Sequence, residues 1–211
     1  MKSNNKSYII SIDPGISGGL SVFEQETKKI VLFQKNPIQS DNKKSKYNLQ
    51  EFYEIFSKYT PCKIASEFVH SMPGEGSTSS FRFGRSSGQI EGLAFGMQIP
   101  YTLVTPQKWK KYFTSNLISD EMLKLKEDLK VFTTKIKLIK TIKNKKERSE
   151  TLKTETKIKN KISYHYKKIA KRLSREHASN LYPETQDMLK KTTYDGVADA
   201  ILIGVYYMST F

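Results

Sequence analysis

The sequence predicts an α/β fold, in which a mixed five-stranded sheet is flanked by helices and a lysine-rich helical insertion interrupts the chain. Three observations support this prediction. Short apolar runs bounded by turn residues alternate with helix-like segments, in the order β-β-β-α-β-α-β-α. The first three runs follow one another over short turns, which is typical of antiparallel strands. A strongly basic, amphipathic stretch lies near the end of this order.

Each element is predicted from its own pattern. Residues 8–13 form an apolar strand that Pro14-Gly15 ends, and residues 20–23 and 30–33 form two further strands separated by charged turn residues. The remaining expectations are a helix at 48–58, a strand at 63–68, a polar loop at 71–80, a helix at 88–97, a strand at 101–104, helices in the basic stretch, a helix at 163–181 that stops at Pro183, and an apolar helix at 194–207.

Length and composition limit the class of protein. A chain of 211 residues and 24.3 kDa is long enough for one domain, here expected over 1–211 with an insertion at 115–163. Its single cysteine, Cys62, excludes an internal disulfide and favours a reducing compartment. No apolar run approaches the roughly 20 residues of a membrane span, and the polar N-terminus is not typical of a secretory signal. We therefore expect an intracellular protein without a membrane partner, in the cytoplasm of a cell or host or in an organelle.

The charge is concentrated in one segment. The chain has 36 Lys and Arg against 21 Asp and Glu, a net charge of +15. Residues 107–176 hold 22 of the basic and 8 of the acidic residues, so the rest of the chain is close to neutral. An excess of this size indicates a polyanionic partner, most often a nucleic acid.

The basic segment is also amphipathic. Apolar residues recur at steps of three and four, which predicts a helix; they are Met122, Leu125, Leu129, Phe132, Ile136 and Ile139. Ile158, Ile162 and Ile169 indicate a second helix after a polar turn near 144–150. Two interpretations remain open: a solvated hairpin that packs on its own core, or a basic arm that grips a phosphate backbone or a partner subunit.

Four carboxylates lie in or next to apolar segments, where burial of an ionised group is energetically unfavourable. Asp13 and Glu67 each end an apolar strand, and Asp195 and Asp199 lie four residues apart at the start of an apolar helix, on one helical face. Gathered acids repel one another unless a cation neutralises them, and Mg²⁺ takes such oxygen ligands. Two ions can activate a water and stabilise the leaving oxygen of a phosphodiester. Asp13 could instead be a turn residue, and Asp195 a helix cap.

These residues stand in a longer pattern that resembles the RuvC-type Holliday junction resolvases, especially their phage and plastid branch. Six stretches match in register, and they cover nearly all of the chain outside about 50 residues of the insertion. They are SIDPGISGGL at 11–20, EFVHSMPGEG at 67–76, FRFGRSSG at 81–88, VTPQKWKK at 104–111, SREHASNLYP at 174–183 and DGVADA at 195–200.

The resemblance implies an RNase H-like fold and a metal-dependent endonuclease acting in DNA recombination and repair. It implies that a homodimer nicks opposite strands of four-way junction DNA, with two Mg²⁺ ions per active site, for which Mn²⁺ would substitute, and no nucleotide cofactor. The implied catalytic and metal-binding residues are Asp13, Glu67, Asp195 and Asp199. The implied DNA-binding residues are His70, Phe81, Arg82, Phe83, Arg85, Lys108, Lys110 and Arg175.

The chain departs from the family at two places. Bacterial members often carry a wedge Phe three residues after the catalytic Glu, where this chain has His70, with Phe68, Phe81 and Phe83 nearby. Which ring stacks at the crossover is therefore open. The insertion is also longer than the family's usual connection.

Other classes of protein fit the sequence less well. Residues 13–19 also resemble the phosphate hairpin of sugar kinases and actin-like ATPases, but the chain has no second hairpin. A basic DNA-binding protein without catalysis would have the same charge but no reason to keep four acids in position. A serine hydrolase and a zinc site are excluded, because 84–88 lacks a preceding strand and the histidines are scattered. Trp109 is either packed against the sheet or a base-stacking residue.

Overall fold

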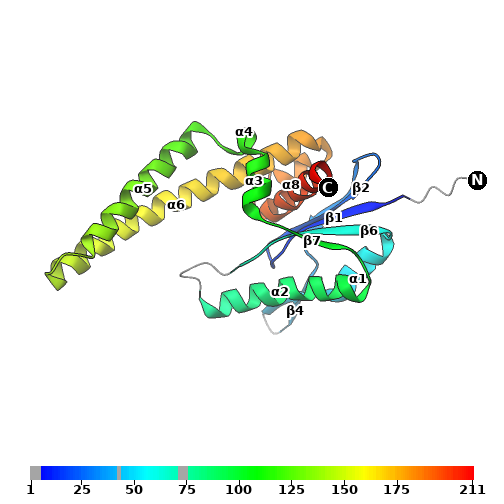
Figure 1. The fold of residues 1–211 in the computed structure, drawn as a ribbon, viewed down its shortest axis with the longest axis horizontal. Helices are drawn as coiled ribbons and strands as arrows, with labels where there is room; N and C mark the ends of the chain where they lie inside the picture. The colour runs from blue at the N-terminus through cyan, green and yellow to red at the C-terminus, as the bar shows by residue number, and fades with distance from the viewer. Residues whose placement is uncertain (1–5, 42–43, 71–75) are drawn as a thin grey trace, which may run out of the picture. The chain divides into compact units, whose positions relative to one another are not determined.

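The structure is a computed structural model that describes residues 6–41, 44–70 and 76–211 (Figure 1). The chain divides into two compact units, and each is described by itself. The first comprises residues 1–113 and 174–211, and the second comprises residues 114–173. The candidate site residues all belong to the first unit, whereas most of the excess positive charge belongs to the second.

A mixed five-stranded sheet forms the centre of the first unit. Its strands are β1 (Tyr8–Asp13), β2 (Gly19–Glu24), β3 (Ile30–Lys35), β6 (Cys62–Glu67) and β7 (Tyr101–Val104), in the spatial order β3-β2-β1-β6-β7. The first three strands pair antiparallel, while β6 is parallel to both β1 and β7. This is the RNase H-like arrangement, so the predicted fold class is confirmed.

Both faces of the sheet are covered, which explains why its central strands are apolar almost throughout. On one face, α1 (Leu49–Lys58) and α2 (Ser77–Gly96) bury Phe52, Phe56 and Ile90 in a core with Ile10 and Ile64 of the sheet. On the other face, α8 (Asp195–Thr210) packs against β1 and β2 (Figure 1). Close approach is possible because Gly204 has no side chain; a Cβ there would collide with Phe23.

Helix α2 corrects one prediction. The structure begins this helix at Ser77, eleven residues before the expected start at 88, so residues 77–80 of the loop expected at 71–80 are helical, as are residues 81–87. Residues 71–75 of that expected loop lie outside the described residues. Serines and glycines, which are weak helix formers, hid the pattern. Tertiary packing overrides their low propensity, because α2 buries Ser86, Ser87, Ile90 and Ala94.

A second sheet was not predicted. Strands β4 (Ile38–Asp41) and β5 (Lys44–Tyr47) pair antiparallel, with Ile38 opposite Tyr47. Only these end residues are large and apolar, so the alternation that reveals a half-buried strand is missing. The other short elements of the first unit are α3 (Pro106–Tyr112), η1 (Pro183–Thr185), α7 (Gln186–Leu189) and η2 (Thr192–Tyr194).

The second unit contains α4 (Thr114–Leu117), α5 (Asp120–Ile139) and the first part of α6 (Lys145–Leu181), whose last turns belong to the first unit. The sequence predicted a turn near 144–150 and a separate helix from 163. Both bounds are wrong, because one continuous helix runs from Lys145 to Leu181. Asn144 starts it, because its side chain accepts hydrogen bonds from the backbone N–H groups of Lys146 and Glu147. Among the described residues, no helix has the length and apolarity to span a bilayer.

Candidate active site

Asp13 and Glu67 end two neighbouring parallel strands. In the pairing of β1 with β6, Ile12 lies opposite Ser66, so the next residue on each strand is one of these two acids. The carboxyl ends of parallel strands meet at the same edge of a sheet. The register therefore places Asp13 and Glu67 close together at one edge of the sheet, which the sequence could only suggest.

The loop after Asp13 fixes the start of α8. Gly15 has a φ of +119°, which favours glycine, and the amide of the buried Asn36 donates to the carbonyl oxygens of Asp13 and Gly15 at 2.8 and 2.9 Å. Gly18 and Gly196 form a β-bridge, and a Cβ on Gly196 would collide with the Gly18 backbone. Since Gly196 directly follows Asp195, this contact between glycines brings that carboxylate to the end of β1.

Asp199 lies one turn further along α8, in an environment that disfavours its charge. Burial raises its pKa to about 6, and the nearby carboxylates of Glu67 and Asp195 add to the rise. Lys110 and a hydrogen bond with Ser174 act in the opposite direction. Three of the four predicted acids are thus close to one another, although Glu67 comes from β6 and the other two from α8.

Glu67 is held by a tryptophan. The indole Nε1 of Trp109 donates to Glu67 Oε1 at 2.9 Å, and Trp109 is fully buried. Burial raises the pKa of Glu67, while this hydrogen bond and Lys110 lower it. The Lys110 ammonium lies 4.9 Å from the Trp109 ring centroid. Trp109 is therefore packed and not available for base stacking, whereas its neighbour on α3 supplies a positive charge to the acids.

Arg175 has a partner within the protein that the sequence did not predict. Its guanidinium forms an ion pair with the Asp195 carboxylate, and both side chains are largely buried. The sequence prediction assigned Arg175 to DNA. The structure places it beside the acids, where it neutralises one of them.

The donor set suits a hard divalent cation, because all four candidate residues are carboxylates. The structure does not, however, draw them into a closed coordination shell: among the described residues, no three His, Cys, Asp or Glu side chains converge closely enough to hold a metal. Two of the acids have protein partners instead, since Glu67 accepts from Trp109 and Asp195 is paired with Arg175. The chemistry of the residues fits a metal, while the full geometry of a metal site is not shown.

The other predicted DNA-binding residues fall into three places. Phe81, Arg82 and Arg85 are exposed on the first turns of α2, whereas the Phe83 ring packs against the Gly15 backbone. Lys108 and Lys110 are exposed on α3. His70 is exposed after β6, and its ring stacks on Phe68 with centroids 5.9 Å apart.

Several supporting residues could not be predicted from the sequence. Asn36 and Ser174 hold the loop and Asp199 from distant parts of the chain, and Tyr47 accepts a hydrogen bond from the Gly15 N–H at 2.5 Å. Nothing in their local pattern distinguishes them from surface polar residues. Only Trp109 carried a signal, as a large aromatic residue among lysines.

Comparison with known proteins gives a limited result. No protein-family model and no curated protein matches the chain. Among solved structures, a Thermus thermophilus RuvC in complex with a Holliday junction substrate matches at 16% identity and a TM-score of 0.39, covering 50% of this chain and 68% of that one. A second Thermus thermophilus RuvC structure matches at 19% identity and a TM-score of 0.37, covering 49% and 67%. The assignment of the fold rests on the strand order and pairing described above.

Proposed function

We propose that this protein is a metal-dependent endonuclease that resolves four-way DNA junctions by paired nicks. One observation carries the proposal: Glu67 and Asp199 share a partly buried site in which burial raises the pKa of both carboxyls, and the charges of Glu67 and Asp195 raise that of Asp199 further. Such an arrangement opposes folding, and raised carboxyl pKa values of this kind cluster at functional sites. Asp13 and Asp195 extend the same site from β1 and from the first turn of α8.

The four carboxylates would hold divalent cations, Mg²⁺ or Mn²⁺, in this proposal. When bound, such ions supply an activated water and stabilise the leaving oxygen of a phosphodiester. The protein's own groups orient the ligands: Trp109 fixes Glu67 by its 2.9 Å hydrogen bond, and Ser174 fixes Asp199. Lys110 offers a cation for the phosphate of the substrate.

Arg175 would take a second role during the reaction. It neutralises Asp195 in the structure, and it would be available to the substrate if a divalent cation held by Asp195 supplied that neutralisation instead. A guanidinium freed in this way forms bidentate hydrogen bonds with phosphate. The predicted DNA-binding role of Arg175 is thereby compatible with its observed ion pair.

A symmetric junction calls for two sites related by a twofold axis, so we also propose a homodimer. Its interface would be α2, where Gly84, Gly88, Gly92 and Gly96 form one row and, apart from the adjacent residues and backbone of α2 itself, no described atom would lie within 4 Å of an added Cβ. Sedimentation of the protein at micromolar concentration, with and without junction DNA, should give a dimer. A monomer under both conditions would contradict this part.

One assay separates the proposal from its two alternatives. The protein is incubated with Mg²⁺ and either a four-way junction, a linear duplex of the same sequence or ATP. We expect paired nicks in the junction alone, and their loss in EDTA. ATP hydrolysis without cleavage would favour the actin-like or sugar-kinase interpretation. Junction binding without cleavage in either Mg²⁺ or Mn²⁺ would favour a non-catalytic DNA-binding protein.

A further inference from the structure

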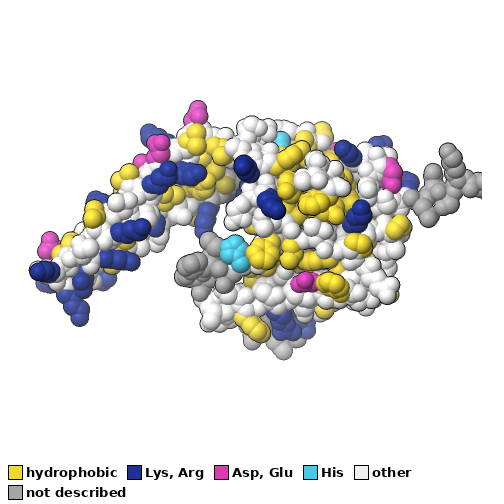
Figure 2. Space-filling model, viewed as in Figure 1, with side chains coloured by type: hydrophobic (Ala, Val, Ile, Leu, Met, Phe, Trp, Pro, Cys, Tyr) yellow, Lys and Arg dark blue, Asp and Glu magenta, His cyan; other side chains and the backbone are white. Residues whose placement is uncertain are grey.

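The two long helices of the second unit differ in charge, although both are rich in lysine. Helix α5 has five Lys and four acidic residues, so its charges nearly cancel. Residues 145–173 of α6 have eleven Lys or Arg and three Glu. Dark-blue side chains spread over this part of the molecule in Figure 2. The positive excess of the segment therefore belongs mainly to α6.

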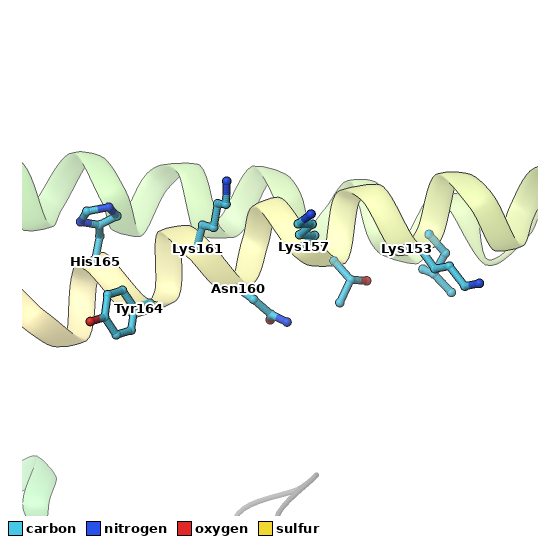
Figure 3. A pocket seen from close by; sticks show the side chains of 8 residues that line it. Lys153, Lys157, Asn160, Lys161, Tyr164 and His165 are labelled. Carbon is cyan, nitrogen blue, oxygen red and sulfur yellow. The ribbon is translucent and has the colours of Figure 1, made fainter.

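Part of this excess lines an open pocket along one side of α6 (Figure 3). Its lining follows two adjacent rows at four-residue spacing: Leu152, Thr156, Asn160 and Tyr164 in one row, and Lys153, Lys157, Lys161 and His165 in the other. The lysines, Asn160, Tyr164 and His165 are exposed. No acidic residue is among these eight described residues.

The lysine row lies on the side of α6 that faces away from α5. Glu155 is buried and its carboxylate forms an ion pair with Lys135 of α5 at 2.6 Å, so Glu155 marks the side of α6 that contacts α5. Residues two positions apart on a helix point about 200° apart. Lys153 and Lys157 therefore point away from the hairpin's own interface, and the packing of the hairpin does not account for them.

We propose that this face of α6, the lysine row with Asn160 and Tyr164 beside it, binds the phosphate backbone of a duplex DNA arm. Each four-residue step advances about 6 Å, so the three lysines span about 12 Å of helix axis. One strand of B-DNA carries about three to four phosphates over that axial length. Asn160 and Tyr164 add hydrogen-bond donors for phosphate oxygens. No base-reading pattern is needed, so the contact is independent of sequence.

The inference rests on the proposed function only for its choice of DNA among polyanions. The test compares two variants of the full-length protein with equal loss of charge: K153Q/K157Q/K161Q on the lysine row, and K126Q/K130Q/K137Q on exposed positions of α5. Affinity for a junction with long arms is measured in EDTA over a series of salt concentrations. Circular dichroism checks that both variants keep the helical content of the wild type.

The lysine-row variant should reduce the slope of log affinity against log salt by about 2 to 3, at about 0.9 for each phosphate that is no longer neutralised. The α5 variant should change the slope by less than about 1, because its lysines are not expected to reach the DNA. Equal slopes for the two variants would overturn the inference, and so would tighter binding of the wild type to phosphatidylserine vesicles than to DNA. Because binding is measured without metal, failure of cleavage by the wild type would reject the proposed function and leave this comparison intact.

Discussion

The candidate active site and the lysine row of α6 use charge in opposite ways. At the site, Glu67 of β6 and Asp199 of α8 lie where burial disfavours ionisation, and the pKa of Asp199 rises to about 6. On α6, lysines stand exposed, where a charge loses little hydration. The buried acids destabilise the fold and need fixed positions. The exposed lysines cost little stability and do not need fixed positions.

The difference indicates two separate tasks. Buried acids held by Trp109 and Ser174 have the fixed geometry that chemistry needs, since a reacting group must be placed within a fraction of an ångström. Exposed lysines attract phosphate at longer range and tolerate variation in position. Substitutions in the two regions should therefore change different measured quantities.

The largest effect is expected from single substitutions of the acids. Asp13→Asn, Glu67→Gln and Asp199→Asn should each lower the cleavage rate by about 10³-fold or more, since a metal ligand contributes several kcal/mol to transition-state stabilisation. Asp195→Asn should act in the same direction. Junction affinity in EDTA should not fall. The exposed Glu54→Gln is the matched control and should cleave like the wild type.

Removal of residues 115–163 should change binding more than chemistry. We expect a short Gly-Ser link in their place to weaken junction affinity and flatten its salt dependence, because many lysines are removed. Cleavage at saturating protein should survive, since the four acids lie outside this segment. A soluble deletion variant with unchanged junction affinity and unchanged salt slope would show that the segment is solvent-exposed and does not contribute to DNA binding. An unfolded product would show that it completes the core or the dimer.

Trp109→Phe tests the support of Glu67. The substitution keeps the aromatic packing but removes the donor to Glu67 Oε1, so the cleavage rate should fall about 10- to 100-fold. In the wild type this hydrogen bond lowers the pKa of Glu67, so the acidic limb of the variant's pH–rate profile should move to higher pH. A variant that is slower at every pH by the same factor would indicate a purely structural role.

Asp199→Asn should have a smaller, stabilising effect on the fold without metal. The ionised form of Asp199 is disfavoured in the native state, so the wild type loses stability as pH rises from about 4 to 6. The variant should therefore unfold at a higher temperature at about pH 8, by about 1 to 3 kcal/mol in free energy, and lose this advantage near about pH 4. Thermal melts in EDTA measure both. A variant less stable than the wild type at the higher pH would contradict the account.

The sequence was sufficient where one segment determines its own structure. The apolar runs that end in Asp13 and Glu67 predicted β1 and β6, and the periodicity from Met122 to Ile139 predicted α5. It failed where distant contacts decide. The first turns of α2 are built from weak helix formers, and β4 and β5 lack apolar alternation.

The candidate site divides in the same way. The acids stood out locally, because an ionisable residue in an apolar run is unusual. The contacts of their supporting residues could not be predicted locally: Asn36 lies 23 residues from Asp13, and Trp109 lies 42 residues from Glu67. The ion pair between Arg175 and Asp195 also joins distant positions, so no local pattern could reveal that this arginine neutralises an acid.

The separation of the two tasks is the central claim, and one set of four proteins tests it. The wild type, Glu67→Gln, the K153Q/K157Q/K161Q variant and the combination of both are compared on one four-way junction. Dissociation constants are measured in EDTA, and single-turnover cleavage rates are measured in Mg²⁺ at saturating protein. The account predicts that Glu67→Gln lowers only the rate, the lysine variant only the affinity, and the combination both by independent factors. A Glu67→Gln variant that cleaves at the wild-type rate, or a lysine variant with wild-type affinity and a slow saturated rate, would contradict it.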